Sequence, residues 1–415
     1  MNQRSTRFAA IVLFAVPFCA IADNTNAVSA SSVFSFSGFS TVGETHSSET
    51  NADFNASIFQ PNGAGHSRSW SPTVDSLIGG QISARITPEL SAVVQVIAQQ
   101  NYDGTYRPHV EWANIKYQLT PDLSARIGRV ELPTFLFSDT RKVGYTLPWV
   151  RPPIEVYSLI PISNSDGADA SYRLNLWDVI NTTQGSYVQS NAQQPNNRGL
   201  AMARNSINLS NTTEYRSLTF RVSYQHALLT IASLDGFLDN FKMFGPQGIA
   251  IVDKYNSDGK PVVTEVIGAS YQPGHWFVIS EWGHARFNSF LGETTAWYAS
   301  SGIRVGTFTP YATYSRASAA SNSDPGLALG GLPPGYAGFA AGLNAALNSI
   351  LQQIPDQSTI SLGTRWDFVK NVDLKMQFDH TRIGAGSDGT LINLQPGYRP
   401  GGTVNLFSAT VDFVF

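Results

Sequence analysis

Apolar and polar residues alternate over short stretches along almost the whole chain. In 372–382, for example, Leu374 and Met376 alternate with Lys375 and Gln377. Successive side chains of a β-strand point to opposite faces, so a period of two predicts a strand with one apolar and one polar face. Because this pattern recurs from one end of the chain to the other and no helix–strand alternation interrupts it, we predict an all-β protein.

Sixteen segments carry the strand pattern. They are 33–42, 77–87, 91–99, 111–119, 123–129, 168–177, 183–189, 206–210, 218–231, 262–271, 276–286, 295–306, 311–318, 358–368, 372–382 and 403–415. Short joints alternate with long joints rich in Gly, Ser and Asp, which is typical of an up-and-down barrel with short turns on one rim. In lipid every backbone polar group must be paired, which only a closed barrel of strands achieves. We predict a transmembrane up-and-down antiparallel β-barrel of about 16 strands.

The first residues have the features of a signal peptide. Arg4 and Arg7 precede an apolar stretch, 8–22, that is too short for a confident membrane span and ends in a small-x-small motif. We predict residues 1–22 as the leader, with an alternative cut after residue 30, and 31–415 as a single outer-membrane β-barrel domain. The only cysteine, Cys19, lies in the leader, so the exported chain would have no disulfide.

Charge decides which face of the barrel is inside. The chain has 27 Lys and Arg against 30 Asp and Glu, a formal net charge of −3, and no basic run, which argues against nucleic-acid binding. The polar faces of the strands carry too many charges for a dry core, so we expect them to line a wet lumen. By this parity the predicted pore wall carries Arg85, Lys116, Arg126, Arg173, Arg221, Arg304, Arg365 and Lys375.

The alternation disappears between about 130 and 167. Loops of this length inside a compact fold are uncommon and often functional, and this one is too apolar and aromatic to hang in water. Its prolines stiffen it and its glycines let it bend. We expect a long loop packed inside the barrel. Its candidate pore-constriction residues are Glu131, Asp139, Arg141, Lys142, Arg151 and Glu155.

Two other long joints have helical features. Residues 235–260 contain a stretch consistent with a helical turn. Residues 339–354 place Phe339, Leu343, Leu347 and Leu351 at helical spacing. We expect a short amphipathic helix lying on the barrel mouth, where it packs on its neighbours rather than binding a ligand.

With these features the sequence resembles Gram-negative outer-membrane porins of the trimeric, 16-stranded type. The resemblance rests on the alternating last strand that ends in Phe415, on the early segment 34–43, and on Arg126-Ile-Gly-Arg129 followed by Pro133 and a long loop. It implies a third loop folded into the channel, a homotrimer, contact with outer-membrane lipid and lipopolysaccharide, and passage of small polar solutes or ions. The predicted loop mixes acids with bases, which departs from the mainly acidic loop of such porins.

The expected function is therefore passive diffusion of small hydrophilic solutes and ions across the bacterial outer membrane. A substrate-specific channel for anions, sugars or small organic acids is the alternative, because the inward basic residues and the aromatic residues of the loop permit it. An adhesin with a closed lumen or a barrel enzyme is less favoured. The seven histidines are isolated, without a Ser/His/acid arrangement or metal spacing, so we expect no enzyme, no metal site and no cofactor.

Overall fold

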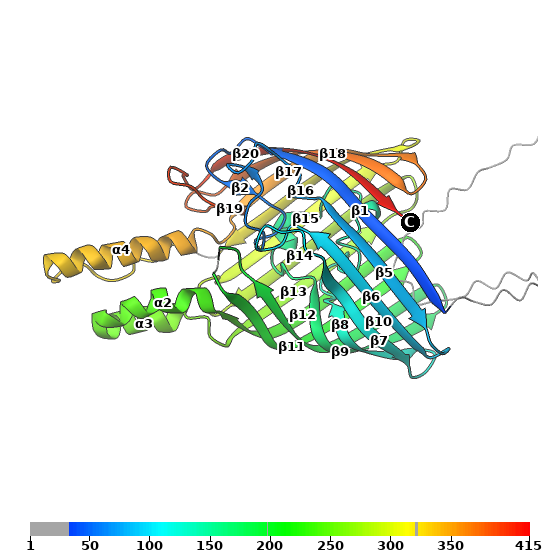
Figure 1. Cartoon of the computed structure of the whole chain (residues 1–415), viewed down its shortest axis with the longest axis horizontal. Helices are drawn as coiled ribbons and strands as arrows, with labels where there is room; N and C mark the ends of the chain where they lie inside the picture. The colour runs from blue at the N-terminus through cyan, green and yellow to red at the C-terminus, as the bar shows by residue number, and fades with distance from the viewer. Residues whose placement is uncertain (1–32, 197, 320–322) are drawn as a thin grey trace, which may run out of the picture.

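A computed structural model describes residues 33–196, 198–319 and 323–415; the predicted leader lies outside these residues. Within them, sixteen long antiparallel strands close into one barrel (Figure 1). The strands are β1 (Phe34–Ser47), β5 (Leu77–Arg85), β6 (Leu90–Gln99), β7 (His109–Gln118), β8 (Leu123–Glu131), β9 (Asn164–Leu176), β10 (Val179–Gln193), β11 (Leu200–Tyr215), β12 (Leu218–Ile231), β13 (Lys260–Tyr271), β14 (Trp276–Phe287), β15 (Glu293–Ile303), β16 (Phe308–Ala319), β17 (Gln357–Val369), β18 (Val372–Ile383) and β20 (Gly402–Val414). The predicted fold class is confirmed.

The two ends of the described chain close the barrel. Strand β20 pairs with β1, and Thr41 lies opposite Asp412 in that pairing. The backbone of Phe415 continues the seam, because its N–H donates to the carbonyl of Gly38 at 3.0 Å and its carbonyl accepts from the N–H of Gly38 at 2.9 Å. A Cβ at position 38 would overlap the ring of Phe415, so the terminal aromatic ring packs directly on this glycine at the seam. Closure leaves no free sheet edge between these strands.

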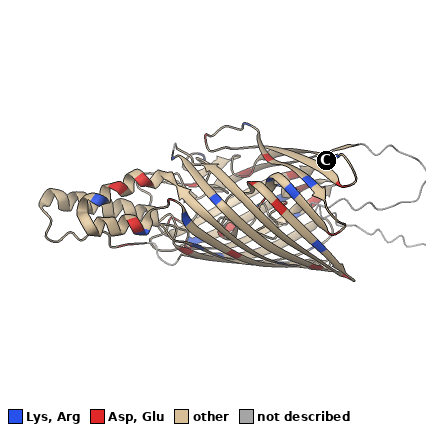
Figure 2. Cartoon of the chain, turned by 90° about the horizontal axis from the view of Figure 1, so that it is seen from below, with Lys and Arg blue, Asp and Glu red and all other residues tan. Residues whose placement is uncertain are grey.

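The two faces of the strands follow the predicted parity. On β18, Asp373 and Lys375 are fully buried on the inner side, whereas Met376 and Phe378 are 43% and 44% exposed on the outer side. Figure 2 shows that charged residues are sparse along the strands of the barrel. The apolar residues therefore face outward and the polar residues inward, the arrangement that a barrel surrounded by lipid requires.

The two rims differ in the length of their connections. Two-residue turns join β9 to β10, β11 to β12 and β17 to β18. Trp177, Arg216 and Asn371 adopt positive φ in these turns. Positive φ lets a two-residue turn follow the twist of the two strands that it joins. The other rim carries the long loops, including the short strands β2 (Asp53–Phe54), β3 (Ala64–Gly65), β4 (Trp70–Ser71) and β19 (Leu391–Ile392).

Helices extend from the long-loop rim. Between β12 and β13 lie η2 (Ala232–Leu234), α2 (Asp235–Leu238), η3 (Asp239–Phe244) and α3 (Gly245–Tyr255), and before β17 lies α4 (Pro334–Leu351). Leu343, Leu347 and Leu351 of α4 pack against Phe241 and Val252 in one apolar cluster. The helix at 339–354 is thus confirmed, but its expected place is wrong: α4 projects away from the rim beside α3 instead of lying on the mouth (Figure 1). It does so because its apolar face is covered by the helices of the loop between β12 and β13.

No helix among the described residues is long and apolar enough to cross a membrane.

Candidate functional site

The lumen loop, as we call residues 132–163, connects β8 to β9. It contains the short helices η1 (Gly144–Thr146) and α1 (Ile154–Tyr157). Every residue of the loop is buried or half-buried, although the loop has no strand partner. It reaches this state by crossing the interior of the barrel and contacting the inner side of strands on several sides. The predicted boundary, 130 to 167, is slightly too wide, because Glu131 ends β8 and Asp166 belongs to β9.

Aromatic rings fix the loop against β14 and β15. Phe135 stacks on Tyr157 within the loop, and Trp149 meets Tyr298 of β15 edge to face at 5.6 Å. The indole N–H of Trp149 donates to the hydroxyl of Ser300 at 2.8 Å. The buried Trp149 therefore satisfies its one polar group, which lets a large ring be placed inside a polar wall without a desolvation penalty.

The carboxylate of Glu281 on β14 organises the same region. It accepts hydrogen bonds from the hydroxyls of Tyr157 at 2.8 Å and Tyr298 at 2.9 Å, and from the backbone N–H of Leu136 at 2.7 Å. Glu281 is 1% exposed. Sequence reasoning missed this residue, because its inward neighbours on β14, Phe277 and Ile279, are apolar and break the polar-inside pattern.

Arg151 is the most connected charge of the loop. Its guanidinium donates to both carboxylate oxygens of Asp75, at 2.8 and 2.7 Å, and reaches a carboxylate oxygen of Asp379 at 3.4 Å. It also donates to the hydroxyls of Thr45 at 3.0 Å and Ser408 at 2.7 Å. One side chain thus fastens the loop to β1, β18, β20 and the segment that precedes β5. The sequence identified Arg151 but gave no signal for Asp75, which lies outside any strand.

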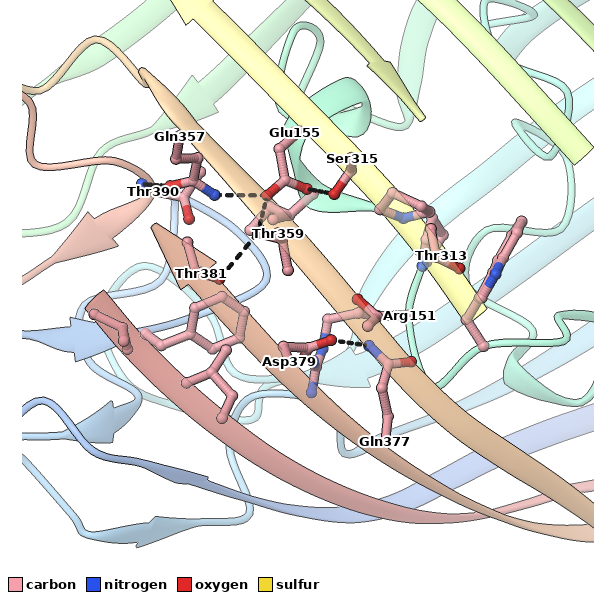
Figure 3. A pocket seen from close by; sticks show the side chains of 18 of the residues that line it. Arg151, Glu155, Thr313, Ser315, Gln357, Thr359, Gln377, Asp379, Thr381 and Thr390 are labelled. Atoms are coloured by element: carbon pink, nitrogen blue, oxygen red, sulfur yellow. Dashed lines mark hydrogen bonds and ion pairs between the residues drawn. The ribbon is translucent and has the colours of Figure 1, made fainter. Parts of the chain in front are cut away.

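Glu155 holds the loop to the neighbouring strands β16 and β17 (Figure 3). Its carboxylate accepts from the hydroxyls of Ser315 at 2.8 Å and Thr359 at 2.5 Å, and from the amide of Gln357 at 2.8 Å. Glu155 is 2% exposed, and no Lys or Arg lies within 4 Å of it in the described part of the chain. Three donors replace the water that its charge would otherwise bind.

Three basic residues of the predicted pore wall donate hydrogen bonds to backbone carbonyls of the loop. Lys375 donates to the carbonyl of Gly144 at 2.5 Å, and Arg365 donates to those of Tyr145 at 2.5 Å and Leu147 at 3.2 Å. Arg221 donates to the carbonyl of Phe135 at 2.5 Å and lies 3.9 Å from Asp139 of the loop. Their inward direction agrees with the parity argument. Their contacts show that they position the loop.

The remaining loop candidates make fewer contacts. Arg141 donates to backbone carbonyls at the end of the same loop, at 3.1 to 3.4 Å, and Lys142 donates to the amide oxygen of Gln99 on β6 at 2.9 Å. Glu131 forms a paired hydrogen bond with Arg126 at 2.8 and 2.9 Å. The loop charges thus lie inside the barrel with separate partners and do not form a single cluster.

The other wall candidates lie toward the short-turn rim. Arg304 donates to the carbonyl of Gly274 and to Gln272, so it braces the turn between β13 and β14. Arg85 is exposed near the turn that follows β5. Lys116 and Arg173 are half-buried on the inner side of β7 and β9. Lys116 and Arg173 therefore keep part of their side chains accessible on the inner wall.

A small cavity of about 40 Å³ lies beside the second half of the lumen loop. It lies between Arg151, Glu155 and the polar inner face of β16 to β18, and Phe54 and Leu391 line it from the long-loop rim (Figure 3). Near its roof, burial alone raises the pKa of Asp388 to about 6. No group of three or more His, Cys, Asp or Glu is placed to hold a metal within residues 33–196, 198–319 and 323–415.

Comparison with known proteins supports the fold. No protein family matches the sequence, and no curated protein sequence matches it. Solved structures do match. The anion-selective porin from Comamonas acidovorans is 10% identical, with a TM-score of 0.54 over 92% of this chain and 99% of that chain. Salmonella typhi OmpF, solved with daunomycin, is 11% identical, with a TM-score of 0.53 over 92% and 97% of the two chains. The outer membrane channel DcaP of Acinetobacter baumannii is 10% identical, with the same TM-score and coverage. At these identities the likeness establishes the porin fold.

Proposed function

We propose that this protein is a porin of the bacterial outer membrane, a passive channel through which small hydrophilic solutes and ions diffuse. One observation carries the proposal: a closed barrel with an apolar outside and a polar inside holds a long loop fastened across its lumen. Such a loop narrows a channel without sealing it, and fixed charges then sort the solutes that pass. The structural likeness to porins of known structure supports this reading.

The same arrangement supports the role that we propose for the lumen loop. Arg151 and Glu155 hold its second half, while Asp139, Arg141 and Lys142 lie in its first half. We assign the first group to positioning the loop and the second to the margin of the constriction. Catalysis is not part of the proposal. Ser163 donates to Glu111, and His109 lies 3.6 Å from that carboxylate, so the acid separates the hydroxyl from the imidazole. A nucleophile needs the base beside it.

A homotrimer is also proposed, and the outer surface supports it. The outward residues of β5 and β6 are small or aliphatic, among them Ile78, Gly80, Ile82 and Val94, and none is aromatic. Elsewhere the outer face carries exposed tryptophans, such as Trp282 and Trp297, of the kind that anchor barrels at the lipid interface. The smooth face suits contact with a second copy, whereas the tryptophan-bearing face suits membrane lipid and lipopolysaccharide.

The test is planar-bilayer recording of the purified, folded protein. Stepwise conductance that closes in groups of three is the expected result for a trimer of open channels. A folded barrel that remains electrically silent would contradict the proposal and favour an adhesion role. A small conductance blocked by one solute at low concentration would instead support the substrate-specific alternative.

A further inference from the structure

The inner wall of β7, β8 and β9 carries charges in register. Lys116 lies opposite Arg126 in the pairing of β7 with β8, and Arg126 lies opposite Asp169 in the pairing of β8 with β9. Arg173 follows on the same face of β9, four residues nearer the short-turn rim, and lies opposite Thr182 of β10. We call Lys116, Arg126, Asp169 and Arg173 the basic arc.

The carboxylates nearest the basic arc are already paired with arginines of the barrel wall. Arg126 donates to both oxygens of Asp169, at distances of 2.7 and 3.0 Å, and to both oxygens of Glu131, at 2.8 and 2.9 Å. Asp139 of the lumen loop faces Arg221 at 3.9 Å. Paired, charge-assisted hydrogen bonds of this kind hold the acids against their own arginines. They leave little negative charge to attract cations in solution.

Two bases of the arc lack such partners. Among the described residues, neither Lys116 nor Arg173 has a carboxylate within 4 Å, and both are half-buried rather than enclosed. Glu111 of β7 is 2% exposed and accepts a hydrogen bond from Ser163 of the lumen loop, so it is enclosed. Glu214 is half-buried near the short-turn rim of β11, opposite Thr219. The arc and its surroundings thus present more accessible positive than negative charge. The negative charge of Glu214 partly offsets the two cations.

We infer that the channel prefers anions, and that Lys116 and Arg173 determine this preference. The ligands are small inorganic anions and carboxylates, which pass the arc by exchanging water for these two cations. The inference rests on the proposed channel function and adds the sign of its ion selectivity. A unit charge about 7 Å away in water changes the local concentration of a monovalent ion roughly threefold, and salt near 0.1 M reduces this to about twofold. Two such charges suffice to set the selectivity of a narrow channel.

The experiment is the zero-current potential of the full-length protein in a planar bilayer with a gradient of KCl. The wild type should give the sign expected for chloride preference. The double variant Lys116→Gln/Arg173→Gln should lower the ratio of chloride to potassium permeability by about sevenfold, because each charge enriches chloride and depletes potassium by a similar factor. Glu214→Gln should raise the ratio, because it removes the opposing charge. Lys116→Arg/Arg173→Lys keeps both charges and should retain the wild-type value.

Lys242→Gln is the matched control, since Lys242 lies on η3 among the helices beyond the long-loop rim, where it pairs with Asp239, and it should leave the ratio unchanged. Heat-modifiable migration in electrophoresis verifies that each variant folds. A conducting wild type with potassium preference would overturn the inference and leave the channel function standing, as would an unchanged ratio in the folded double variant. A folded wild type without conductance would overturn the channel function itself.

Discussion

Arg151 provides the sharpest test of how the lumen loop is held. Its guanidinium is 8% exposed and contacts two carboxylates, of Asp75 and Asp379, that are themselves 4% and 6% exposed. The substitution Arg151→Met keeps much of the side-chain volume but removes the charge. Both carboxylates then stay buried without their cation, and so do the hydroxyls of Thr45 and Ser408 without their donor.

Breaking a buried ion pair by removing one partner costs about 3–5 kcal/mol, because an uncompensated charge is left behind. We therefore expect Arg151→Met to lower the free energy of unfolding by that amount, measured from urea denaturation of the purified barrel in detergent. The loop is released locally as well, so single-channel current should become larger and noisier. Neutralising one acid in Arg151→Met/Asp75→Asn should recover part of the loss.

Arg216→Met is the matched control. The ion pair of Arg216 with Asp178 lies on the short-turn rim, with side chains 68% and 63% exposed, and such pairs contribute about 0–1 kcal/mol. If Arg151→Met unfolds at the wild-type urea concentration and conducts with wild-type noise, the reasoning that this residue fastens the loop is refuted.

Three further predictions follow from the same contacts. Glu155→Gln replaces one acceptor oxygen by a donor amide, so we expect a loss of about 1–3 kcal/mol in urea denaturation; an unchanged midpoint would contradict the role of Glu155. Replacing 235–256 and 325–353 by short Gly-Ser linkers should leave heat-modifiability and conductance intact, because the helices pack on one another in a cluster of their own. Burial raises the pKa of Asp388 from 3.8 to about 6, so the folded loop retains a proton that the unfolded chain releases. Amide-exchange protection in 384–401 should therefore be highest below about pH 4 and fall as the pH rises to about 6, and Asp388→Asn should abolish that dependence.

The alternation of residue types was enough to predict the barrel. A period of two depends only on neighbours along the chain, so the strands, their inward and outward faces and the short turns could be located without knowing what each strand pairs with. The same argument predicted the inward direction of Lys375 and Arg365, and both lie on the inner side. Helical spacing likewise identified α4, although its packing partner lies in another loop and its direction was therefore predicted wrongly.

Only the tertiary structure decided what the charges do. Arg151 meets Asp75 across 76 positions of the chain, and Glu155 meets Thr359 across 204. No local pattern specifies partners at such separations, because they depend on the path of a loop that has no repeating geometry. For the same reason the sequence could place Arg221, Arg365 and Lys375 on the wall but could not show that they hold the loop. The sequence thus determined the barrel and which face of each strand points inward. Long-range contacts determined which charged residues hold the lumen loop in place and which remain accessible in the lumen.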